Sequence, residues 1–294
     1  MTDAPALDLA HADKRFGKTH ALRSVSLRID GGGVVAVLGQ NGAGKTTLIR
    51  AALGLLALDT GSATIFGIES VERSARESVG VMLQDSDLPD LLTPRELIEL
   101  FGSYYPRPFS VARTLELARV EDFADKRYKT LSGGQKRRVQ FALAIVGDPA
   151  LVFLDEPTTG LDPDARRTLW SVVRALVEQG KTIVLTTHYL EEADTLADRI
   201  VVMREGQLVA DAPAADIRAT LGGSIIRCAS TLSQDSLRTL SSVSSVSMAG
   251  RMVEIQSSNA ATTLRELLDQ DPAIEDLSVS RPNLEDVFAR EYSS

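Results

Sequence analysis

The sequence predicts a mixed α/β fold: a parallel sheet with intervening helices, an antiparallel N-terminal β subdomain, an inserted helical subdomain and a small C-terminal α+β domain. Three observations predict it. Short apolar, β-branched runs alternate with stretches of helical periodicity, which is typical of parallel strands joined by helices. The strand pattern stops at about residues 88–146 and then resumes, which indicates a helical insertion. After residue 221 the composition shifts towards serine, which predicts two domains, 1–221 and 222–294.

Length and composition fit one large domain and one small domain. The 294 residues are 44% hydrophobic and 24% charged, which allows a substantial core. The net charge of −8 argues against broad nucleic-acid binding through a basic face. The single cysteine, Cys228, lies in an apolar run, so we expect a buried small hydrophobe in a reducing cytosol.

The sequence predicts neither a signal peptide nor a membrane span. Residues 1–9 carry acidic side chains and lack the apolar core of a signal peptide. No stretch approaches the roughly 18 apolar residues that a spanning helix needs. We therefore expect a soluble chain, or one that reaches a membrane only through a partner.

The first elements are strands at 7–14 and 21–29, with Phe16 among the cations Lys14, Arg15 and Lys18 between them. Phe16 is either a packed aromatic in a hairpin turn or a ring that stacks on a nucleotide base. Its position upstream of a glycine-rich loop at 39–46 favours stacking.

The glycine-rich loop reads Gly-Gln-Asn-Gly-Ala-Gly-Lys-Thr and lies between an apolar strand at 34–38 and a helix at 47–53. It fits the pattern G-x-x-x-x-G-K-[ST], in which backbone N–H groups and a helix N-terminus point at a polyphosphate. Lys45 is expected to reach the β- and γ-phosphates, and the Thr46 hydroxyl to bind Mg²⁺. The alternative is a chance glycine-rich turn. The loop and its flanks predict a nucleoside triphosphate site.

Further strands are predicted at 63–67 and 79–84. The second ends in Gln84, a lone polar residue at the C-terminal end of a buried strand. Open α/β sheets place ligand contacts at such ends. Gln84 is therefore a candidate ligand contact, and a capping or loop role is the alternative.

The insertion begins with a helix that starts at Thr93 and Pro94 and continues through 97–104. Further helices are predicted at 110–119 and 121–126. The insertion closes on Leu-Ser-Gly-Gly-Gln at 131–135, followed by a helix over 136–144. Such a turn exposes helix N-terminal N–H groups, so it is either a second anion site or an ordinary N-cap.

An apolar strand at 151–155 ends in two adjacent carboxylates, Asp155 and Glu156. Successive strand residues point to opposite faces, so the two carboxylates can act separately. Asp155 is expected on the Mg²⁺ side, and Glu156 beside an attacking water. Acidic residues that only cap the strand are the alternative.

A turn at 158–163, a helix at 164–179 and a strand at 181–188 follow. His188 terminates that strand, which makes it a candidate site residue. His11 and His20 lie in the N-terminal strands and are expected to be structural.

The remaining chain is predicted as a helix at 191–197, a strand pair turned at Glu205 and Gly206, and a C-terminal unit. That strand pair occupies 198–203 and 207–210. In the C-terminal unit, strands are expected at 225–229, 243–248, 252–256 and 274–280, and helices at 233–240, 260–268 and from Asn283. Its order βαββαβ is that of a ferredoxin-like unit.

Taken in this order and spacing, residues 7–210 resemble the nucleotide-binding subunit of an ATP-binding-cassette (ABC) transporter, a P-loop NTPase. The resemblance makes 39–46 the Walker A loop, 131–135 the family signature and 151–155 the Walker B strand. It implies ATP and Mg²⁺ as cofactors. One departure is Gln40, where proline is common in the family.

The resemblance also implies a role for each candidate residue. Phe16 resembles the aromatic that stacks on adenine, and Gln84 resembles the glutamine that contacts Mg²⁺ and couples to the membrane partner. Glu156 resembles the catalytic glutamate and His188 the switch histidine at the γ-phosphate. The implied catalytic residues are Lys45, Gln84, Glu156, Asp162 of the D-loop, and His188. The implied Mg²⁺ ligands are Thr46, Gln84 and Asp155. The implied nucleotide contacts are Phe16, Gly39, Asn41, Gly42, Ala43, Gly44, Lys45, Thr46, Thr47, Ser132, Gly133, Gly134 and Gln135.

The same resemblance implies the assembly. In the family the signature turn binds the γ-phosphate of ATP held by the other subunit, so two chains would sandwich two ATP molecules as a homodimer that opens on hydrolysis. An integral membrane permease is the implied partner, docked by the helical insertion on the cytoplasmic side of the inner membrane. Residues 155–163, 188–193 and 284–288 are similar to daunorubicin-resistance and ABC-2 type exporters, which implies outward transport.

Two other interpretations compete with an exporter ATPase. Soluble ABC ATPases of ribosomes or DNA usually carry two cassettes, a coiled coil or zinc modules, whereas this sequence shows one cassette, no heptad run and one cysteine. A non-hydrolysing regulator is disfavoured because Lys45, Asp155, Glu156 and His188 are all present. The C-terminal unit could regulate, assist dimerisation or only pack.

Overall fold

The structure is a computed structural model that describes residues 4–84, 87–219 and 223–280. The chain divides into two compact units, Met1–Ala212 and Pro213–Ser294. The boundary expected after residue 221 falls at 220–222, outside the described residues, and the division comes earlier because helix α8 (Ala214–Ala219) groups with the second unit. Within the described ranges, no helix combines the length and apolar character that crossing a membrane requires.

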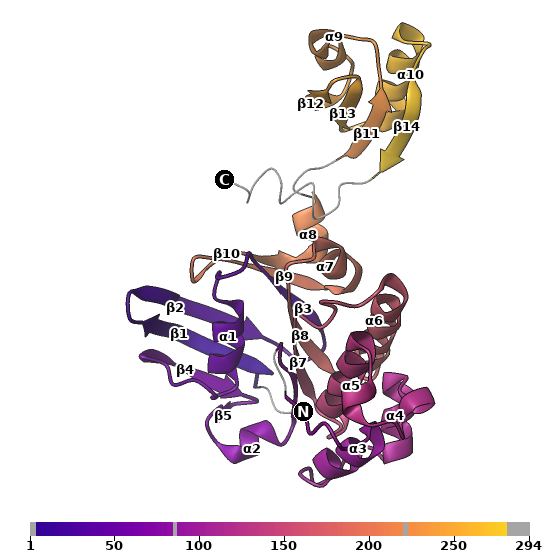
Figure 1. The fold of residues 1–294 in the computed structure, drawn as a ribbon. Helices are drawn as coiled ribbons and strands as arrows, with labels where there is room; N and C mark the ends of the chain where they lie inside the picture. Colours follow the sequence, from indigo (N-terminus) through magenta and orange to yellow (C-terminus); the bar gives the residue numbers. More distant parts are fainter. Residues whose placement is uncertain (1–3, 85–86, 220–222, 281–294) are drawn as a thin grey trace. The chain divides into compact units, whose positions relative to one another are not determined.

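The first unit begins with an antiparallel sheet in the strand order β2–β1–β4–β5 (Figure 1). Alternate residues of β1, such as Leu7 and Leu9, are buried against helix α1 (Lys45–Ala52), as expected of strands with one face on a core. This confirms the expected antiparallel sheet at the N-terminus. Its strands are β1 Leu7–Phe16, β2 Thr19–Ile29, β4 Thr60–Ile65 and β5 Ile68–Glu69.

A second sheet has the order β10–β9–β3–β8–β7–β6 and holds the predicted parallel strands. The pairs β3–β8, β3–β9, β7–β8 and β6–β7 are parallel, so their C-terminal ends lie along one edge. Strands β3, β7 and β8 are almost wholly buried, which is why they read as continuous apolar runs. The strands are β3 Gly33–Leu38, β6 Val79–Met82, β7 Leu151–Asp155, β8 Thr182–Thr187, β9 Arg199–Arg204 and β10 Gln207–Pro213.

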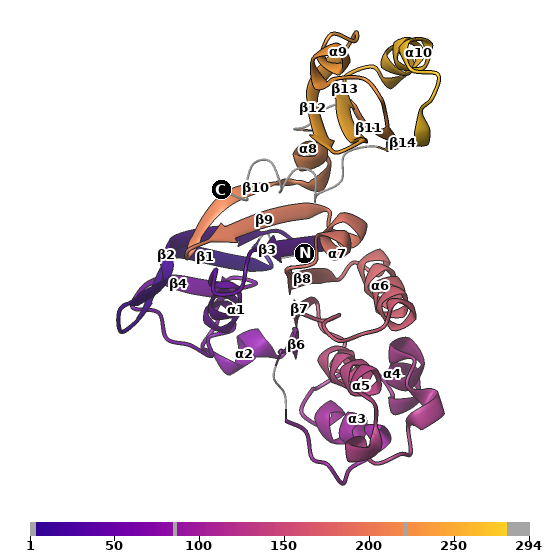
Figure 2. The ribbon, with the colours of Figure 1, turned by 45° about the horizontal axis from the view of Figure 1, so that its top comes forward.

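Helices cover both faces of the parallel sheet. Helix α1 packs between the two sheets (Figure 2). Its residues Leu48, Ile49 and Ala52 belong to one core with residues of both sheets. Helices α6 (Pro163–Glu178) and α7 (Leu190–Leu196) pack on β8. A short helix α2 (Arg73–Arg76) and strand β5 were not predicted, because pieces of four and two residues carry no periodicity.

The helical insertion lies between β6 and β7 and, among its described residues, contains no strand. Helix α3 (Pro94–Gly102) starts as predicted, with Thr93 and Glu96 in a reciprocal capping box. Helices α4 (Val111–Ala118) and α5 (Gly133–Ile145) follow. The helix expected at 121–126 is wrong: only a 3₁₀ turn, Glu121–Phe123, forms, because Arg119 takes a left-handed φ of 54° and ends α4 just before it.

After α8, the second unit has the element order βαββαβ that the sequence predicts. Its antiparallel sheet has the order β12–β13–β11–β14, and Cys228 is buried in its core, where burial raises the pKa of the thiol. The terminal helix expected from Asn283 and the segment 284–288 lie outside the described residues. The elements are β11 Ser224–Ala229, α9 Gln234–Arg238, β12 Val243–Ala249, β13 Met252–Ser257, α10 Ala260–Gln270 and β14 Glu275–Ser280.

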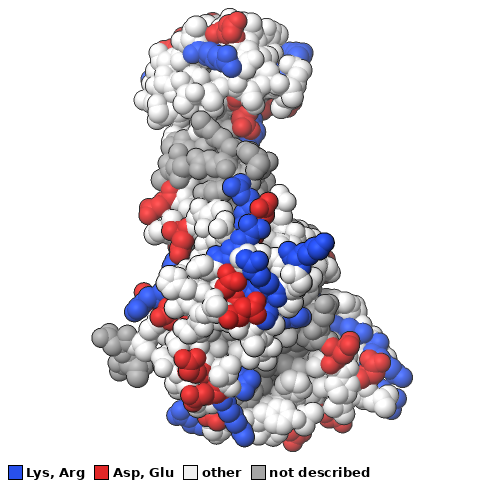
Figure 3. Space-filling model, turned by 90° about the vertical axis from the view of Figure 1, so that its left-hand side faces the viewer, with Lys and Arg blue, Asp and Glu red and all other residues white. Residues whose placement is uncertain are grey.

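Charge on the surface is mixed in sign. Figure 3 shows acidic and basic side chains interspersed on one face of the molecule, with no broad basic area on that face. Several opposite charges are paired, such as Arg199 with Asp211, whose side chains lie 2.6 Å apart. This distribution is in keeping with the net charge of −8.

Candidate functional site

The glycine-rich loop connects β3 to α1, and two of its glycines occupy places where a side chain does not fit. A Cβ at Gly39 would lie 2.5 Å from the backbone oxygen of Met203, and one at Gly44 would lie 2.5 Å from that of Ala21. Gly44 also has a φ of 106°, which L-residues rarely adopt, and it immediately precedes α1. The loop is thus fixed against β9 and β2, while Asn41 at its tip is exposed.

Lys45 is the first residue of α1, and its buried ammonium folds back over the loop. Nζ donates a hydrogen bond to the backbone oxygen of Gly39 at 2.7 Å and lies 3.5 Å from Oε1 of Glu156. Thr46 and Thr47 follow in the first turn and are half-buried. The loop therefore presents a lysine and helix N–H groups to an anion.

Asp155 ends β7 and is buried, with its two carboxylate oxygens in different situations. Oδ1 accepts a hydrogen bond from the hydroxyl of Thr186 on β8. Oδ2 has no hydrogen-bond partner among the described residues. A buried carboxylate oxygen without a partner is costly unless a cation or water meets it. This oxygen is suited to a cation.

Glu156 leaves the strand with a left-handed φ of 50°, and its side chain is buried between two other site residues. Nδ1 of His188, just past the end of β8, lies 2.7 Å from Oε2 of Glu156. The amide of Glu156 donates to the backbone oxygen of Thr186 at 3.1 Å. Lys45, Glu156 and His188, far apart in sequence, therefore meet at the C-terminal edge of the sheet.

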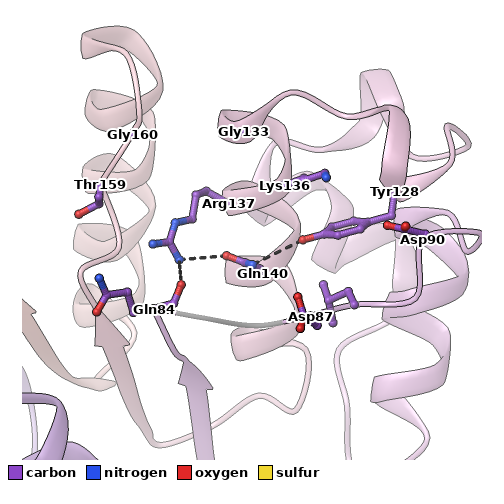
Figure 4. Close-up of a pocket in the computed structure, with 11 residues that line it drawn as sticks. Gln84, Asp87, Asp90, Tyr128, Gly133, Lys136, Arg137, Gln140, Thr159 and Gly160 are labelled. Atoms are coloured by element: carbon purple, nitrogen blue, oxygen red, sulfur yellow. Dashed lines mark hydrogen bonds between the residues drawn. The ribbon is translucent and has the colours of Figure 1, made fainter.

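Gln84 lies just beyond β6 and lines a cleft of about 450 Å³. One wall of the cleft is α5, and Figure 4 shows Arg137 reaching from this helix to the backbone of Gln84. Gln84 itself is exposed. The lining residues are Gln84, Asp87, Leu88, Asp90, Tyr128, Gly133, Lys136, Arg137, Gln140, Thr159 and Gly160.

Two predicted site residues are helix caps within the chain. The hydroxyl of Ser132 accepts from the amide of Gln135 at 3.3 Å, and the amide of Ser132 donates to Oε1 of the Gln135 side chain at 2.9 Å. Asp162 accepts from the amides that begin α6, and the N–H of Ala165 lowers the pKa of this carboxyl. A Cβ at Gly134 would lie 3.4 Å from Leu161, so the two caps are neighbours.

The N-terminal aromatic and histidines belong to the antiparallel sheet. Phe16 is 50% exposed at the end of β1, with the ammonium of Lys14 5.7 Å from its ring centre. His20 pairs with Asp13 at 2.8 Å. His11 lies 3.4 Å from a serine hydroxyl.

Two residues of the site escaped the sequence reasoning. Thr186 bonds to both carboxylate residues, and its place near the end of a predicted strand was the available signal. Arg137 donates to backbone oxygens at the ends of β6 and β7. Its position in a helix of several cations gave no such signal, because the contact depends on tertiary structure.

Comparison with known proteins agrees with this geometry. A model of the ABC transporter family matches residues 22–159. The Nod factor export ATP-binding protein I of Burkholderia lata is 42% identical over 234 residues, 77% of this chain and 77% of that protein. A solved ATP-binding subunit of an ABC transporter is similar with a TM-score of 0.67 and 28% identity, over 73% of this chain and 92% of that one. A dimeric ATP-binding cassette in a post-hydrolysis state, bound to ADP and Pi, is similar with a TM-score of 0.65 and 28% identity, over 70% of this chain and 98% of that one.

A parallel sheet with a phosphate loop, and with carboxylates and a histidine at its C-terminal edge, defines a P-loop nucleoside triphosphatase. The chain belongs to the ABC transporter family, as an ATP-binding subunit. It is an ATPase that hydrolyses ATP to drive transport, and membership of the family implies a permease partner.

Proposed function

We propose that this chain powers export through a separate, ABC-2 type membrane permease, from the cytoplasmic side of the inner membrane. The observation that carries the proposal is the meeting of Lys45, Glu156 and His188 beside the phosphate loop. Relatives whose names describe Nod factor export support the outward direction.

The hydrolytic step follows from what these three side chains contact. Lys45 exchanges its bonds to Gly39 and Glu156 for the β- and γ-phosphates of ATP, which neutralises phosphate charge. Glu156, released from the lysine, orients and polarises the attacking water. His188 holds the Glu156 carboxylate at 2.7 Å and contacts the γ-phosphate.

Thr46, Gln84 and Asp155 are proposed to hold Mg²⁺. The unpartnered Oδ2 of Asp155 fits this hard cation, and each of the three side chains offers an oxygen donor: a hydroxyl, an amide carbonyl and a carboxylate. When bound, Mg²⁺ supplies charge neutralisation at the phosphates. The chain's own contribution is to fix Asp155 through the Thr186 hydroxyl before the cation arrives.

The rest of the nucleotide site is proposed from the loop, from Phe16 and from the signature turn of a second copy. Phe16 is exposed enough to stack on adenine. The caps at Ser132 and Gln135 fix the N-terminus of α5, whose N–H groups then receive the γ-phosphate held by the partner. Asp162 is proposed to act at the dimer interface. Homodimeric cassettes among solved relatives support this arrangement. The loop contacts are Gly39, Asn41, Gly42, Ala43, Gly44, Lys45, Thr46 and Thr47, and the signature contacts Ser132, Gly133, Gly134 and Gln135.

We further propose that residues 1–221 form the ATP-binding domain, with the helical subdomain at about 88–146 docking the permease. Residues 222–294 are proposed as an accessory ferredoxin-like domain. The order β12–β13–β11–β14 and the helices between the strands support that assignment.

Capture of the partner tests the proposal. A tagged Glu156→Gln chain, which is expected to bind ATP without hydrolysing it, is incubated with detergent-solubilised membranes of the source cell, with and without ATP. A stoichiometric polytopic membrane protein is expected. The Lys45→Ala/Glu156→Gln chain is the matched control that should not respond to ATP.

Two outcomes contradict the proposal. Capture of ribosomal or DNA-repair proteins instead of a polytopic protein would support a soluble ABC ATPase. A Glu156→Gln chain that hydrolyses ATP at the parental rate would remove Glu156 from its assigned role.

A further inference from the structure

Arg137 on α5 joins the ends of two neighbouring strands. Nη1 donates to the backbone oxygen of Gln84 at 3.2 Å and to that of Leu83 at 3.4 Å (Figure 4). Nη2 donates to the backbone oxygen of Glu156 at 3.4 Å. One guanidinium therefore contacts both the segment after β6 and the segment after β7. Because Arg137 belongs to α5, it connects these two segments to the helix that follows the signature turn.

The sheet register explains why one side chain can reach both segments. Met82 on β6 pairs with Leu154 on β7. Gln84 and Glu156 each lie two residues beyond that pair, at the same level of the sheet. Their carbonyls are past the end of the β6–β7 ladder, and Arg137 supplies donors there.

The chemistry of arginine suits this position. A planar guanidinium offers five N–H donors in a fixed fork, so it can hold several acceptors at one spacing, whereas a lysine ammonium is a point charge on a flexible stem. Gln140, on the next turn of α5, accepts from Nη1 at 3.1 Å and orients the fork. Its amide lies 3.5 Å from the hydroxyl of Tyr128, across the same cleft.

The carbonyl of Glu156 is the contact with a functional consequence. Glu156 has a left-handed φ of 50°, a conformation that side-chain-bearing residues adopt only when the surroundings hold it. Its amide is held by Thr186, its carboxylate by Lys45 and His188, and its carbonyl by Arg137. When ATP draws Lys45 away, Arg137 still fixes the backbone from which the carboxylate projects.

We propose that Arg137 is a positioning residue for ATP hydrolysis: it holds the backbones of Glu156 and Gln84 at one spacing and ties both to the helix that follows the signature turn. The inference rests on the proposed role of Glu156 in orienting water. Movement of α5 relative to the sheet would thereby be transmitted to the carboxylate and to the segment at Gln84.

The test compares Arg137→Met with the parent in the full chain. Arg137→Met keeps an unbranched apolar stem and removes every hydrogen-bond donor of the side chain. We expect kcat for ATP hydrolysis to fall about 10- to 100-fold, because small displacements of a catalytic group cost that much. The KM for ATP should change less than about threefold, since the acceptors of Arg137 at Leu83, Gln84 and Glu156 lie outside the phosphate loop. Arg137→Lys should be intermediate.

Lys136→Met is the matched control. It removes one positive charge from the neighbouring position of the same helix, where the ammonium lies 5.2 Å from the ring centre of Tyr128. Its kcat should stay within about twofold of the parent. Unfolding followed by Trp170, the single tryptophan of the chain, should report similar midpoints for all three variants.

A second comparison separates this inference from the role of Glu156. In a Glu156→Gln background, Arg137→Met should have almost no further effect, because residues that act through one group are not additive. An Arg137→Met chain with parental kcat, or one whose loss of activity follows a loss of fold stability, would overturn the inference while leaving Glu156 intact. Parental activity in Glu156→Gln would instead overturn the proposed function.

Discussion

The contact between Lys45 and Glu156 makes a measurable prediction for the nucleotide-free protein. Both side chains are buried, at 7% and 6% exposure, with charged atoms 3.5 Å apart. At an effective dielectric constant of about 20, unit charges at that distance attract by about 5 kcal/mol, and desolvation of both ions offsets much of this. Lys45→Met is therefore expected to destabilise the first unit by about 3 kcal/mol, because it leaves a buried carboxylate without its lysine.

Removing both charges should cost far less than removing one. The double variant Lys45→Met/Glu156→Gln leaves no unpaired ion, so we expect it within about 1 kcal/mol of the parent. The coupling energy from the four-chain cycle should then be at least about 2 kcal/mol, the difference between about 3 kcal/mol for Lys45→Met and about 1 kcal/mol for the double variant, and any cost of Glu156→Gln alone adds to it.

The assay is urea unfolding without nucleotide, followed by tryptophan fluorescence. Trp170, the single tryptophan, lies in α6, so its signal reports the first unit even if the second unfolds separately. Two single variants whose costs add to that of the double variant within about 0.5 kcal/mol would refute the reasoning. As a companion measurement, ATP at about 100 times its Kd should stabilise the parent by about 2.7 kcal/mol and Lys45→Met by much less.

Three further changes have expected outcomes. Gly44→Ala should cost about 2 kcal/mol or more and abolish ATP binding in calorimetry, because its φ is 106° and a Cβ would meet the backbone oxygen of Ala21. Burial raises the pKa of Glu192, so its ionised form destabilises the fold. In Glu192→Gln the side-chain oxygen can still accept a hydrogen bond from the indole N–H of Trp170, and no charge is buried. This variant should therefore be more stable than the parent at pH 7, and the gain should shrink as the pH falls towards 4.5. The hydroxyl of Ser230 holds the pKa of Asp271 at about 2, so Asp271→Asn should speed amide exchange in the second unit above pH 3.8, without changing ATP hydrolysis.

Each of these has a contrary result. A Gly44→Ala chain with parental ATP affinity would show that the loop tolerates a side chain at that place. A stability gain in Glu192→Gln that persists unchanged below pH 4.5 would show that ionisation of Glu192 is not the cause of the gain. Equal exchange rates in Asp271→Asn and parent would show that this carboxylate does not hold its loop.

The sequence predicts most of the first unit because its strongest signals are local. The apolar runs that became β3, β7 and β8, and the glycine loop before Lys45, needed only spacing and residue type to be located. The bond between His188 and Glu156 was not predictable as a contact, because it depends on the register of neighbouring strands. The prediction of a helix at 121–126 is wrong because α4 ends at Arg119, which has a left-handed φ. The three residues 121–123 that follow form too few hydrogen bonds for a helix to propagate.

For Ser132 the sequence left two interpretations open, and for Asp162 the family resemblance implied a catalytic role; within the single chain both residues make capping contacts. Capping and nucleotide contact use the same helix N-terminus, so residue type alone does not separate them. For Arg137 the sequence predicts no role, because its position among other cations does not reveal its hydrogen-bond acceptors. Those acceptors are identified only once α5 is placed beside β6 and β7.

The turn between β9 and β10 has a practical consequence for shortening the chain. The amide of Gly206 donates to Ala43 in the phosphate loop at 3.0 Å, its carbonyl accepts from Arg23 at 2.8 Å, and the Met203 backbone lies against Gly39. Residues near the C-terminal end of the first unit, Met203 and Gly206, thus contact and support the phosphate loop near its N-terminal end. A truncation meant to isolate that unit must keep β10 through Pro213, and one ending before Gly206 should forfeit ATP binding while leaving every Walker residue in place.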